Sequence, residues 1–360
     1  MSSIEYVPAL RWRRGEYQAL LTLAESVKNR IMPLITIPDI EFDFEEQRQK
    51  RTVDEHVQPF PKRFCQKWGR RPAWVGLDKN IAQESMSNGL DTLSYVFVNL
   101  RSLGARAIPA ISVHADKNTL TAVSSITRQD RLGVGVCIGL EDLMKRNLNA
   151  NLIRLVSTLG LSFSQTDLLL DLGAPNFCPY SDFSAALTRA LSKVKVLKGH
   201  RRLVLIGSAM PESVGALAKG MSEIPRHDWL FYQTALKEMD TRFPQPIFGD
   251  YTVVHPRFRA VDMRLYKPAG KLFYTVKDKW IVCKGGAFQS NRAQMHDHCQ
   301  SIVGNGLFKG PMYSKGDEYI ARCAARVEGP SNATTWKQVA INHHISHVVI
   351  DDLATLGGQP

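Results

Sequence analysis

Short apolar runs recur through the first 256 residues, and a segment with helical spacing follows each of them. The runs are continuous rather than alternating, which is typical of strands whose two faces are both buried. Strands that alternate with helices predict parallel β-α-β units. The eight runs are Tyr6–Trp12, Ile31–Ile37, Ala73–Leu77, Ala105–Val113, Gly133–Leu140, Thr166–Leu170, Arg202–Ile206 and the run inside Pro244–Pro256.

Eight such units predict an α/β fold, a (β/α)₈ TIM-like barrel, which typically takes about 250 residues. The alternative is a doubly wound open sheet with helices on both faces. This alternative stays open because the count of eight depends on accepting the first and the last run as strands.

The last run, inside Pro244–Pro256, is predicted to close the barrel. It contains Asp250 and His255, which suggest a catalytic pair but lie five positions apart. On one continuous strand, side chains at this spacing point to opposite faces and lie ~16 Å apart. We expect Asp250 to reach the barrel mouth, because Gly249 allows the strand to end just before it, and His255 to face away.

The pattern changes after residue 256. Apolar runs at 271–276 and 280–284 predict a hairpin, which does not belong to a β-α repeat. Helical spacing recurs at 292–302, 316–325 and 334–347, and earlier at 211–219 and 227–239. We therefore divide the chain into a barrel, residues 1–256, and a C-terminal α+β appendage, residues 257–360, that packs on the barrel.

Polar residues stand at most of the predicted strand ends. In α/β barrels the loops after the strands meet at one face and form the active site there. Converging carboxylates suit acid–base chemistry or a divalent metal ion, although aspartate is also a frequent helix N-cap and ion-pair partner. The candidate catalytic residues are Asp78, Glu141, Asp171 and Asp250.

The most strongly cationic segment follows the first run, where Arg11 and Arg13 flank Trp12. An arginine forms two parallel hydrogen bonds with a phosphate or a carboxylate. We interpret Arg11, Trp12 and Arg13, together with Arg226, as candidates for binding an anionic substrate. Pairing of the arginines with the acidic strand ends is an equally open alternative.

Two histidines near the C-terminus have the spacing of a metal site. His343 and His347 are four residues apart, so they share one face of a helix. No glutamate follows His343, so the pattern is not that of a metalloprotease. The alternatives are a polar helix that docks on the barrel rim and a phosphate contact that uses the neighbouring Trp336 and Lys337. The cofactor is otherwise unknown, and a divalent metal ion is the candidate.

Charge adds a partner class to this picture. The formal net charge of +12 attracts polyanions, so nucleic acid or another phosphate-bearing ligand is a candidate partner, and a basic solvated surface is the alternative.

The six cysteines are scattered without a Cys-x-x-Cys pair, which favours reduced thiols in a cytosol. No apolar run approaches the ~20 residues that span a bilayer, and no signal pattern opens the chain, so we expect a cytoplasmic protein without a membrane partner. Neither a glycine-rich phosphate fingerprint nor a nucleophile elbow is present.

Seven segments along the chain occur together in one known family: Tyr6–Trp12, Gly15–Leu20, Pro33–Pro38, Pro225-Arg226 with Trp229, Phe248–Tyr251, Tyr274-Thr275, and Trp336 with Asn342–Ile345. The chain resembles the "beta protein" family of temperate phages, phage satellites and bacterial prophage islands over nearly its whole length. The resemblance implies a genetic context rather than a catalytic residue. Such genes sit in accessory cassettes of mobile elements, some beside a host-killing gene, and some of these cassettes resemble anti-phage defence by abortive infection.

Two functional hypotheses follow. In the first, a phage- or satellite-encoded accessory protein works in the host cytoplasm, in an anti-phage defence or toxin-control cassette. It would act by sensing or by binding a partner such as a toxin or defence protein of the same cassette. In the second, the barrel is a hydrolase that acts on a phosphate-bearing or nucleic-acid substrate, with or without a divalent metal ion. Whether the protein is an enzyme is a question of geometry, because barrels host unrelated functions.

Overall fold

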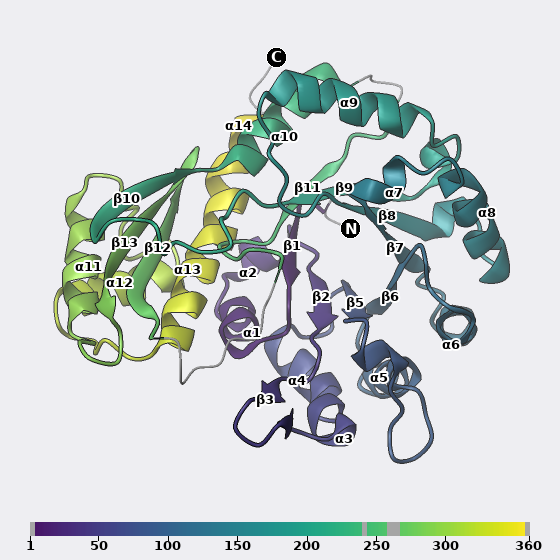
Figure 1. The fold of residues 1–360 in the computed structure, drawn as a ribbon, viewed down its shortest axis with the longest axis horizontal. Helices are drawn as coiled ribbons and strands as arrows, with labels where there is room; N and C mark the ends of the chain where they lie inside the picture. Colours follow the sequence, from purple (N-terminus) through teal and green to yellow (C-terminus); the bar gives the residue numbers. More distant parts are fainter. Residues whose placement is uncertain (1–3, 240–242, 258–266, 357–360) are drawn as a thin grey trace.

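The computed structural model describes residues 4–239, 243–257 and 267–356, and its centre is a closed barrel of eight parallel strands (Figure 1). In the order in which they pair, the strands are β1 (Tyr6–Leu10), β11 (Ile247–Asp250), β9 (Arg202–Gly207), β8 (Thr166–Asp171), β7 (Val134–Gly139), β6 (Ala107–Ser112), β5 (Ala73–Leu77) and β2 (Leu34–Ile37). The predicted (β/α)₈ TIM-like barrel is confirmed. The doubly wound open sheet is wrong, because the sheet closes on itself.

Closure depends on β1, which pairs in parallel with β11 on one side and with β2 on the other. Tyr6 lies opposite Phe248, and Ala9 lies opposite Leu34. β1 and β11 are the two strands on which the predicted count of eight depended. Their pairing removes the free edges that an open sheet would expose.

Alternate strand residues fill the barrel interior, as the two-residue period of a strand requires. Val7, Trp74, Leu169 and Val204 belong to this inner core. A β-carbon at Gly135 would lie 2.7 Å from Cδ1 of Trp74, so the indole ring requires glycine at this position. The barrel is therefore a packed core below its mouth and not a channel.

Helices cover the outside of the barrel, and polar N-caps explain where some of them begin. Asp91 accepts a hydrogen bond from the Ser94 N–H, and Asp116 accepts one from the Thr119 N–H. The covering helices are α1 (Arg14–Leu21), α2 (Glu25–Lys28), α3 (Val53–Val57), α4 (Phe60–Lys67), α5 (Thr92–Ser102), α6 (Lys117–Asp130), α7 (Leu140–Leu143), α8 (Leu148–Thr158), α9 (Tyr180–Ser192) and α10 (His227–Glu238), with 3₁₀ turns at Ile81–Gln83, Phe163–Gln165 and Leu197–Gly199. Within the described ranges, no helix has the length and apolar character needed to cross a membrane.

The helix that covers the barrel after β11 comes late in the chain. α13 (Ala333–His347) packs along α1, and its Ala340, Ile341 and Ile345 join the core outside the barrel strands. Figure 1 shows α13 between the barrel and a separate sheet. It takes the place of the eighth barrel helix. A π-helical turn (Val348–Asp352) and α14 (Leu353–Leu356) follow it.

The segment between β11 and α13 contributes most of a second, smaller unit. β12 (Ala269–Val276) and β13 (Lys279–Ala287) form the predicted hairpin, and β10 (Gly220–Pro225) pairs antiparallel with β13 as a third strand. α11 (Gln294–Gly304) and α12 (Lys315–Ala324) pack on this sheet around a core that includes Tyr274, Cys283 and Cys299. The other face of the sheet turns toward α13, where Thr275 contacts His344.

The predicted helix at 211–219 is wrong, because the described structure has only turns there. The carbonyl groups of Gly215 and Leu217 accept hydrogen bonds from the Lys284 amine at 2.6 and 2.5 Å. In a helix these carbonyls would accept hydrogen bonds from backbone N–H groups, but here they bind a side chain of the smaller unit. β10 follows directly. Two elements thus cross the division predicted at residue 256: β10 lies before it but pairs with β13, and α13 lies after it but covers the barrel.

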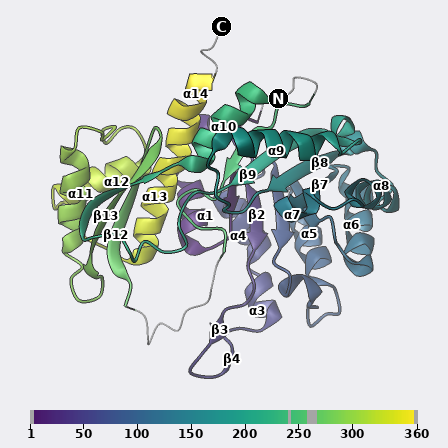
Figure 2. The same ribbon diagram turned by 45° about the horizontal axis from the view of Figure 1, so that its top comes forward.

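A small hairpin follows β2 and consists of β3 (Phe42–Asp43) and β4 (Arg48–Gln49). The Asp43 carboxylate accepts hydrogen bonds from the N–H groups of Glu45 and Glu46 at 2.9 and 3.1 Å, which holds the turn. Figure 2 shows this hairpin projecting from the body of the protein. The chain between β3 and α3 therefore overhangs the space beside the end of β2.

Candidate ligand-binding site

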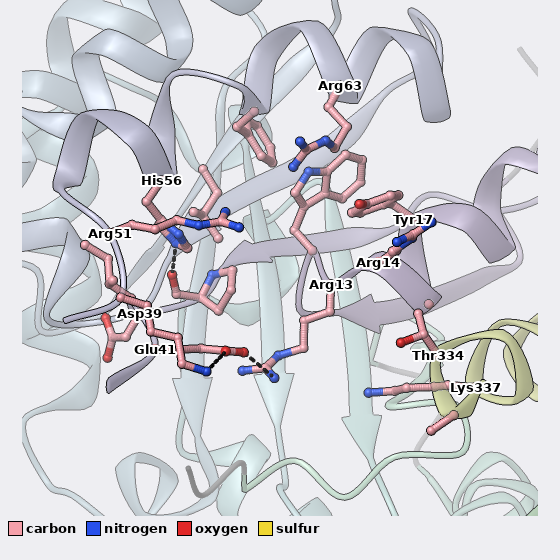
Figure 3. Close-up of a pocket in the computed structure, with 18 residues that line it drawn as sticks. Arg13, Arg14, Tyr17, Asp39, Glu41, Arg51, His56, Arg63, Thr334 and Lys337 are labelled. Atoms are coloured by element: carbon pink, nitrogen blue, oxygen red, sulfur yellow. Dashed lines mark hydrogen bonds and ion pairs between the residues drawn. The ribbon is translucent and has the colours of Figure 1, made fainter. Parts of the chain in front are cut away.

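A cationic cleft opens at the end of the barrel where β1 and β2 finish. Its volume is about 670 Å³, which is within the range of small-molecule sites. The segments after β1 and β2 form one side, α3 and α4 a second, and the first turn of α13 a third (Figure 3). Figure 3 shows Arg51, Arg63 and Lys337 extending toward the cleft from three separate parts of the chain.

Positive charge is in excess in this cleft. Among the residues that the structure describes, only two carboxylates, Asp39 and Glu41, line it. Glu41 is shared between Arg13 at 3.4 Å and Lys50 at 3.3 Å, so it offsets only part of the charge. The six lining cations are Arg13, Arg14, Lys50, Arg51, Arg63 and Lys337. Among the described residues, Arg14, Arg51 and Arg63 have no carboxylate within ion-pair distance.

Two helices begin at the cleft. α1 starts at Arg14, and α13 starts at Ala333, and both residues belong to the lining. A β-carbon at Gly15 would lie 3.1 Å from the Thr334 carbonyl oxygen, so glycine lets the two helix starts approach closely. Helix N-termini carry partial positive charge and attract anions.

Aromatic rings form the apolar wall of the cleft. The Trp12 ring packs against Tyr17 and Phe60, with centroids 5.4 and 5.2 Å apart. The Arg63 guanidinium lies over the Tyr17 ring, 5.4 Å from its centroid. The Trp12 side chain is only 7% exposed, and within the described part of the chain its indole N–H has no hydrogen-bond acceptor. A buried donor without an acceptor is costly, so this N–H favours a ligand that brings one.

Arg13 is a partly buried cation in the wall of the cleft. Burial lowers the pKa of its guanidinium, and the nearby Glu41 and Glu16 carboxylates oppose that shift. The side chain nevertheless stays cationic in water because an arginine begins from a very high pKa. Its fork of N–H groups suits a phosphate or carboxylate oxygen pair. The prediction that Trp12 and Arg13 bind an anion is untested, but both residues line the cleft.

A second group of polar residues lies at the barrel mouth itself. Arg11 contacts Asp78 at 3.4 Å and donates to the Pro256 carbonyl at 3.0 Å. Asp171 accepts a hydrogen bond from the Tyr251 hydroxyl at 2.6 Å and from the Gly173 N–H at 2.8 Å. We call Arg11, Asp78, Asp171 and Tyr251 the mouth cluster. Arg11 is therefore at least partly paired with an acidic strand end, which was the alternative to anion binding.

Burial shifts the acid–base properties of the mouth cluster. It raises the pKa of Asp78 and of Asp171, and the charge of Arg11 opposes the shift at both carboxyls. Burial, followed by the charge of Asp171, also raises the pKa of Tyr251 and brings that of the neighbouring Cys137 thiol to about 12. A raised pKa favours the protonated form of a carboxyl, which is the form that a general acid needs. Neither Asp78 nor Asp171 caps a helix in the described structure.

The expectation that Asp250 reaches the mouth is wrong. Asp250 has the same parity as the outward-facing Phe248, so it points away from the barrel axis, and Tyr251 is the residue that turns inward. The Asp250 carboxylate is fully buried and accepts from the Tyr6 hydroxyl at 2.5 Å and pairs with His344 Nε2 at 2.8 Å. Burial opposes ionisation of Asp250, but the His344 ring and the hydrogen bonds lower its pKa overall. This carboxylate joins α13 to the barrel.

Among the described residues, two other candidates make no contact with the mouth cluster. Glu141 is exposed, and its neighbour Asp142 is the buried residue, pairing with His114 and Lys145 at 2.7 Å each. Arg226 is fully buried at the start of α10 and pairs with Asp352 at 2.7 Å. The structure contradicts an anion-binding role for Arg226, because its side chain is fully buried and pairs with Asp352 inside the protein. Asp250 does not converge with Asp78 and Asp171, because its buried carboxylate pairs with His344, and a catalytic role for the exposed Glu141 stays a prediction.

The predicted metal pair on α13 is wrong. His343 Nδ1 faces the Asp317 carboxylate at 2.9 Å, and His343 Nε2 faces the Thr275 carbonyl at 2.8 Å. Both ring nitrogens of this fully buried side chain therefore face protein oxygen atoms at hydrogen-bond distance, which leaves no space for a metal ion beside either of them. His347 lies 3.1 Å from Asp351 and 3.3 Å from Asp352. Within the described ranges, no group of three or more histidine, cysteine or carboxylate side chains is placed to hold a metal ion.

The sequence patterns did not single out Arg51, and they indicated Lys337 only as part of a phosphate contact beside the two histidines. Lys337 and Arg51 reach the cleft from segments that are remote from β1, so only the tertiary structure brings them together. Arg63 belongs to a basic segment interleaved with aromatic residues, which was a usable signal for nucleic acid or phosphate. Tyr251 follows Asp250 directly, and a shift of one residue in the strand register decides which of them enters the mouth.

The fold and the face that carries the cleft define a (β/α)₈-barrel protein with a smaller α+β unit inserted between its eighth strand and eighth helix. The model of the Beta protein family matches residues 6–350, so the chain belongs to this family. The resemblance found in the sequence is thereby confirmed.

Other comparisons add little to this assignment. No curated protein matches the chain in sequence. Among solved structures, the chain is similar to triosephosphate isomerase from Bartonella henselae, at 12% identity and a TM-score of 0.35, over 70% of this chain and 92% of that one. The assignment of the barrel rests on the strand pairing described above and not on this similarity.

Proposed function

We propose that this protein binds a phosphate-bearing ligand in the cationic cleft and acts in an anti-phage defence or toxin-control cassette of a phage or phage satellite. In this role it senses the ligand or binds a partner of the same cassette in the host cytoplasm. The observation that carries the proposal is the excess of positive charge in the cleft, where six cations face two carboxylates.

The chemistry of the cleft supports phosphate over other anions. Arginine forks match the paired oxygens of a phosphate, and several cations around one space suit a ligand with more than one negative charge. The two helix starts add partial positive charge, and the free indole N–H of Trp12 offers a further donor. The net charge of +12 also favours the approach of polyanions over long range.

The biological setting rests on the family. The chain belongs to the Beta protein family. The resemblance described above implies genes of temperate phages, phage satellites and prophage islands, and this supports a mobile-element context. A defence cassette needs a component that responds to infection, and phosphate-bearing molecules change during phage replication. A sensor with a cationic cleft would bind such a molecule and so link phage replication to the response of the cassette. Abortive infection is the form of defence that we propose.

Charge reversal in the cleft is expected to weaken phosphate binding at least tenfold. Arg14 and Arg51 are exposed and have no ion-pair partner among the described residues, so Arg14→Glu with Arg51→Glu should not disturb the fold. Each charge-assisted hydrogen bond contributes about 1.5–3 kcal/mol, and 1.4 kcal/mol is tenfold in affinity. Binding of inorganic triphosphate would be measured by calorimetry, together with phage plating on cells that carry the cassette.

The matched control reverses the same number of charges elsewhere. Arg128→Glu with Lys198→Glu changes two exposed cations near the opposite end of the barrel strands. This control should bind inorganic triphosphate as the wild type does and should retain protection. Equal triphosphate affinity in the two double variants would show that the cleft is not the phosphate site.

The mouth cluster favours a second candidate function, a hydrolase acting on a phosphate-bearing or nucleic-acid substrate. Asp78 and Asp171 lie at the catalytic face of the barrel fold with raised pKa values. Asp171 is hydrogen-bonded to Tyr251, and Arg11 lies close to the pair as a stabilising charge. This arrangement suits general acid–base catalysis more than metal-assisted catalysis.

Asp171→Asn tests the hydrolase directly. The amide keeps the shape of the side chain but cannot transfer a proton, so hydrolysis of bis-p-nitrophenyl phosphate should fall by about 10²–10⁴-fold. Triphosphate binding in the cleft should stay unchanged, and protection against phage should be lost. Glu141→Gln, which alters an exposed carboxylate, is the control and should change none of the three readouts. Full protection by a folded Asp171→Asn protein would exclude the enzymatic function.

A further inference from the structure

A second hollow lies beside the cationic cleft, and we call it the apolar hollow. Its volume is about 610 Å³, and Val253, Phe273, Phe288 and Trp336 are among the residues that line it. The segments after β9 and β11 form one wall, and β12 of the smaller unit forms another. Both hollows therefore lie at the end of the barrel where ligands bind in this fold.

The first turns of α13 form a wall that the two hollows share. Ala333 and Lys337 line both of them. Lys337 contacts Glu16 at 3.7 Å, so its amine lies beside the start of α1, on the side of the cationic cleft. A ligand that passes this turn of α13 would therefore touch the apolar hollow at one end and the cationic cleft at the other.

Two lysines, Lys271 and Lys337, line the apolar hollow. Lys271 lines the hollow and stands directly opposite Lys284 on the neighbouring strand, an unfavourable like-charge pair. Burial, then the charges of Lys284 and Lys337, lower the pKa of the Lys271 amine. Among the described residues, no carboxylate lies within ion-pair distance of Lys271. An anion between Lys271 and Lys337 would relieve this repulsion.

We propose that the two hollows are subsites for a single nucleotide, whose base enters the apolar hollow and whose phosphates pass Lys271 and Lys337 into the cationic cleft. The inference rests on the proposed function, because the cleft must bind phosphate for the nucleotide to bridge the two hollows.

The lining of the apolar hollow fits a base. Phe273, Phe288 and Trp336 supply aromatic surface, and bases stack on aromatic side chains irrespective of their sequence. Each hollow falls in the range of small-molecule sites, so together they have room for a nucleotide with several phosphates or for the end of a single strand. Lys337 lies on the side toward the cleft, which orients the phosphates away from the aromatic wall of the apolar hollow.

Calorimetry with inorganic triphosphate and the four ribonucleoside triphosphates tests the inference. At least one nucleotide should bind the wild-type protein ten or more times as tightly as inorganic triphosphate. Ala269→Trp should fill the apolar hollow and reduce this advantage to less than threefold, with the affinity for inorganic triphosphate unchanged. Lys271→Ala, which removes no apolar core group, should weaken nucleotide binding at least fivefold and serves if Ala269→Trp does not fold. Arg128→Ala is the exposed-cation control and should have no effect.

Three results would count against the inference, and they differ from one another. Equal affinity for inorganic triphosphate and all four nucleotides would overturn the base subsite and leave the proposed function standing. Octyl phosphate binding as tightly as the best nucleoside monophosphate would show that the hollow accepts any apolar group, and the nucleotide assignment would fall. Absence of binding by every probe, inorganic triphosphate included, would overturn the proposed function and the inference together.

Discussion

Asp352→Ala is expected to lower the free energy of unfolding by about 3–5 kcal/mol, because it leaves the charge of Arg226 buried without its partner. The two side chains are 2% and 0% exposed and lie 2.7 Å apart. Burial disfavours the Arg226 cation, and the charge of Asp352 is the largest influence that keeps its pKa high. Asp352 also lies 3.3 Å from His347, so the substitution removes a second contact of α13.

The measurement is urea unfolding followed by circular dichroism, with ligand binding as a second readout. Arg226 donates to the Lys277 carbonyl in the β12–β13 turn, so the pair connects α10, the smaller unit and the end of α13. Loosening this connection should also weaken triphosphate binding, because α13 forms one wall of the cationic cleft. Both effects follow from the same buried contact.

The double variant Arg226→Met with Asp352→Leu distinguishes two contributions to the loss of stability: the missing ion pair and the buried charge that is left without a partner. It should recover at least half of the lost stability, because apolar side chains of similar size replace a buried ion pair at little cost. Glu223→Ala, which breaks an exposed ion pair with Lys279, should cause a far smaller change. If Asp352→Ala unfolds at the same urea concentration as Glu223→Ala, the buried pair does not hold the units together.

Trp74→Ala is expected to cost about 3–5 kcal/mol of unfolding free energy, because it empties the middle of the barrel. Trp74 is fully buried and packs against Gly135, where no other side chain fits. Its indole N–H donates to Asp167 at 3.0 Å, and Asp167 also binds Arg201 at 2.6 Å. The alanine variant therefore loses packing and leaves a buried carboxylate with one donor fewer.

Urea unfolding and the thermal midpoint would measure this change. Trp74→Phe keeps part of the ring volume and should cost less than half as much as Trp74→Ala. Val98→Ala shortens a side chain that is 47% exposed on α5 and should stay within about 0.5 kcal/mol of the wild type. Equal stability of Trp74→Ala and Val98→Ala would mean that the barrel interior is not close-packed.

The strands of the barrel were predictable because both of their faces are buried. Such strands consist of continuous apolar runs, and the eight predicted runs coincide with the eight barrel strands within a few residues. β10 escaped prediction because most of its side chains are exposed or half-buried, and its backbone pairing with β13 has no local signature. The identity of α13 as the eighth barrel helix was equally hidden, since the smaller unit separates it from β11.

The candidate site was predictable only in part, because each residue's role depends on the direction of its side chain. Asp171 and Asp78 lie at the mouth as expected of strand-end residues, although a catalytic role for them is still a prediction. Asp250 occupies a strand position whose side chain points out of the barrel, one residue away from an inward-facing position, and it therefore contacts His344. Arg226 was a candidate for binding an anionic substrate, but it is buried at the start of a helix and donates to the Lys277 carbonyl of the smaller unit. A one-dimensional pattern does not contain either fact.

The sequence by itself determined the α/β alternation, the count of strands, the hairpin after residue 256 and the Beta protein family. These properties follow from local periodicity and from segments that retain their order along the chain. Only the tertiary structure decided which charged residues face solvent and which are buried as pairs. It placed Lys337 and Arg51 beside Arg13 in one cleft, and it engaged His343 with Asp317 instead of a metal ion. The physical reason is that contacts between segments far apart in the chain decide whether a charged side chain is buried in a pair or exposed to solvent. The residue type is the same in both cases, so the sequence does not distinguish them.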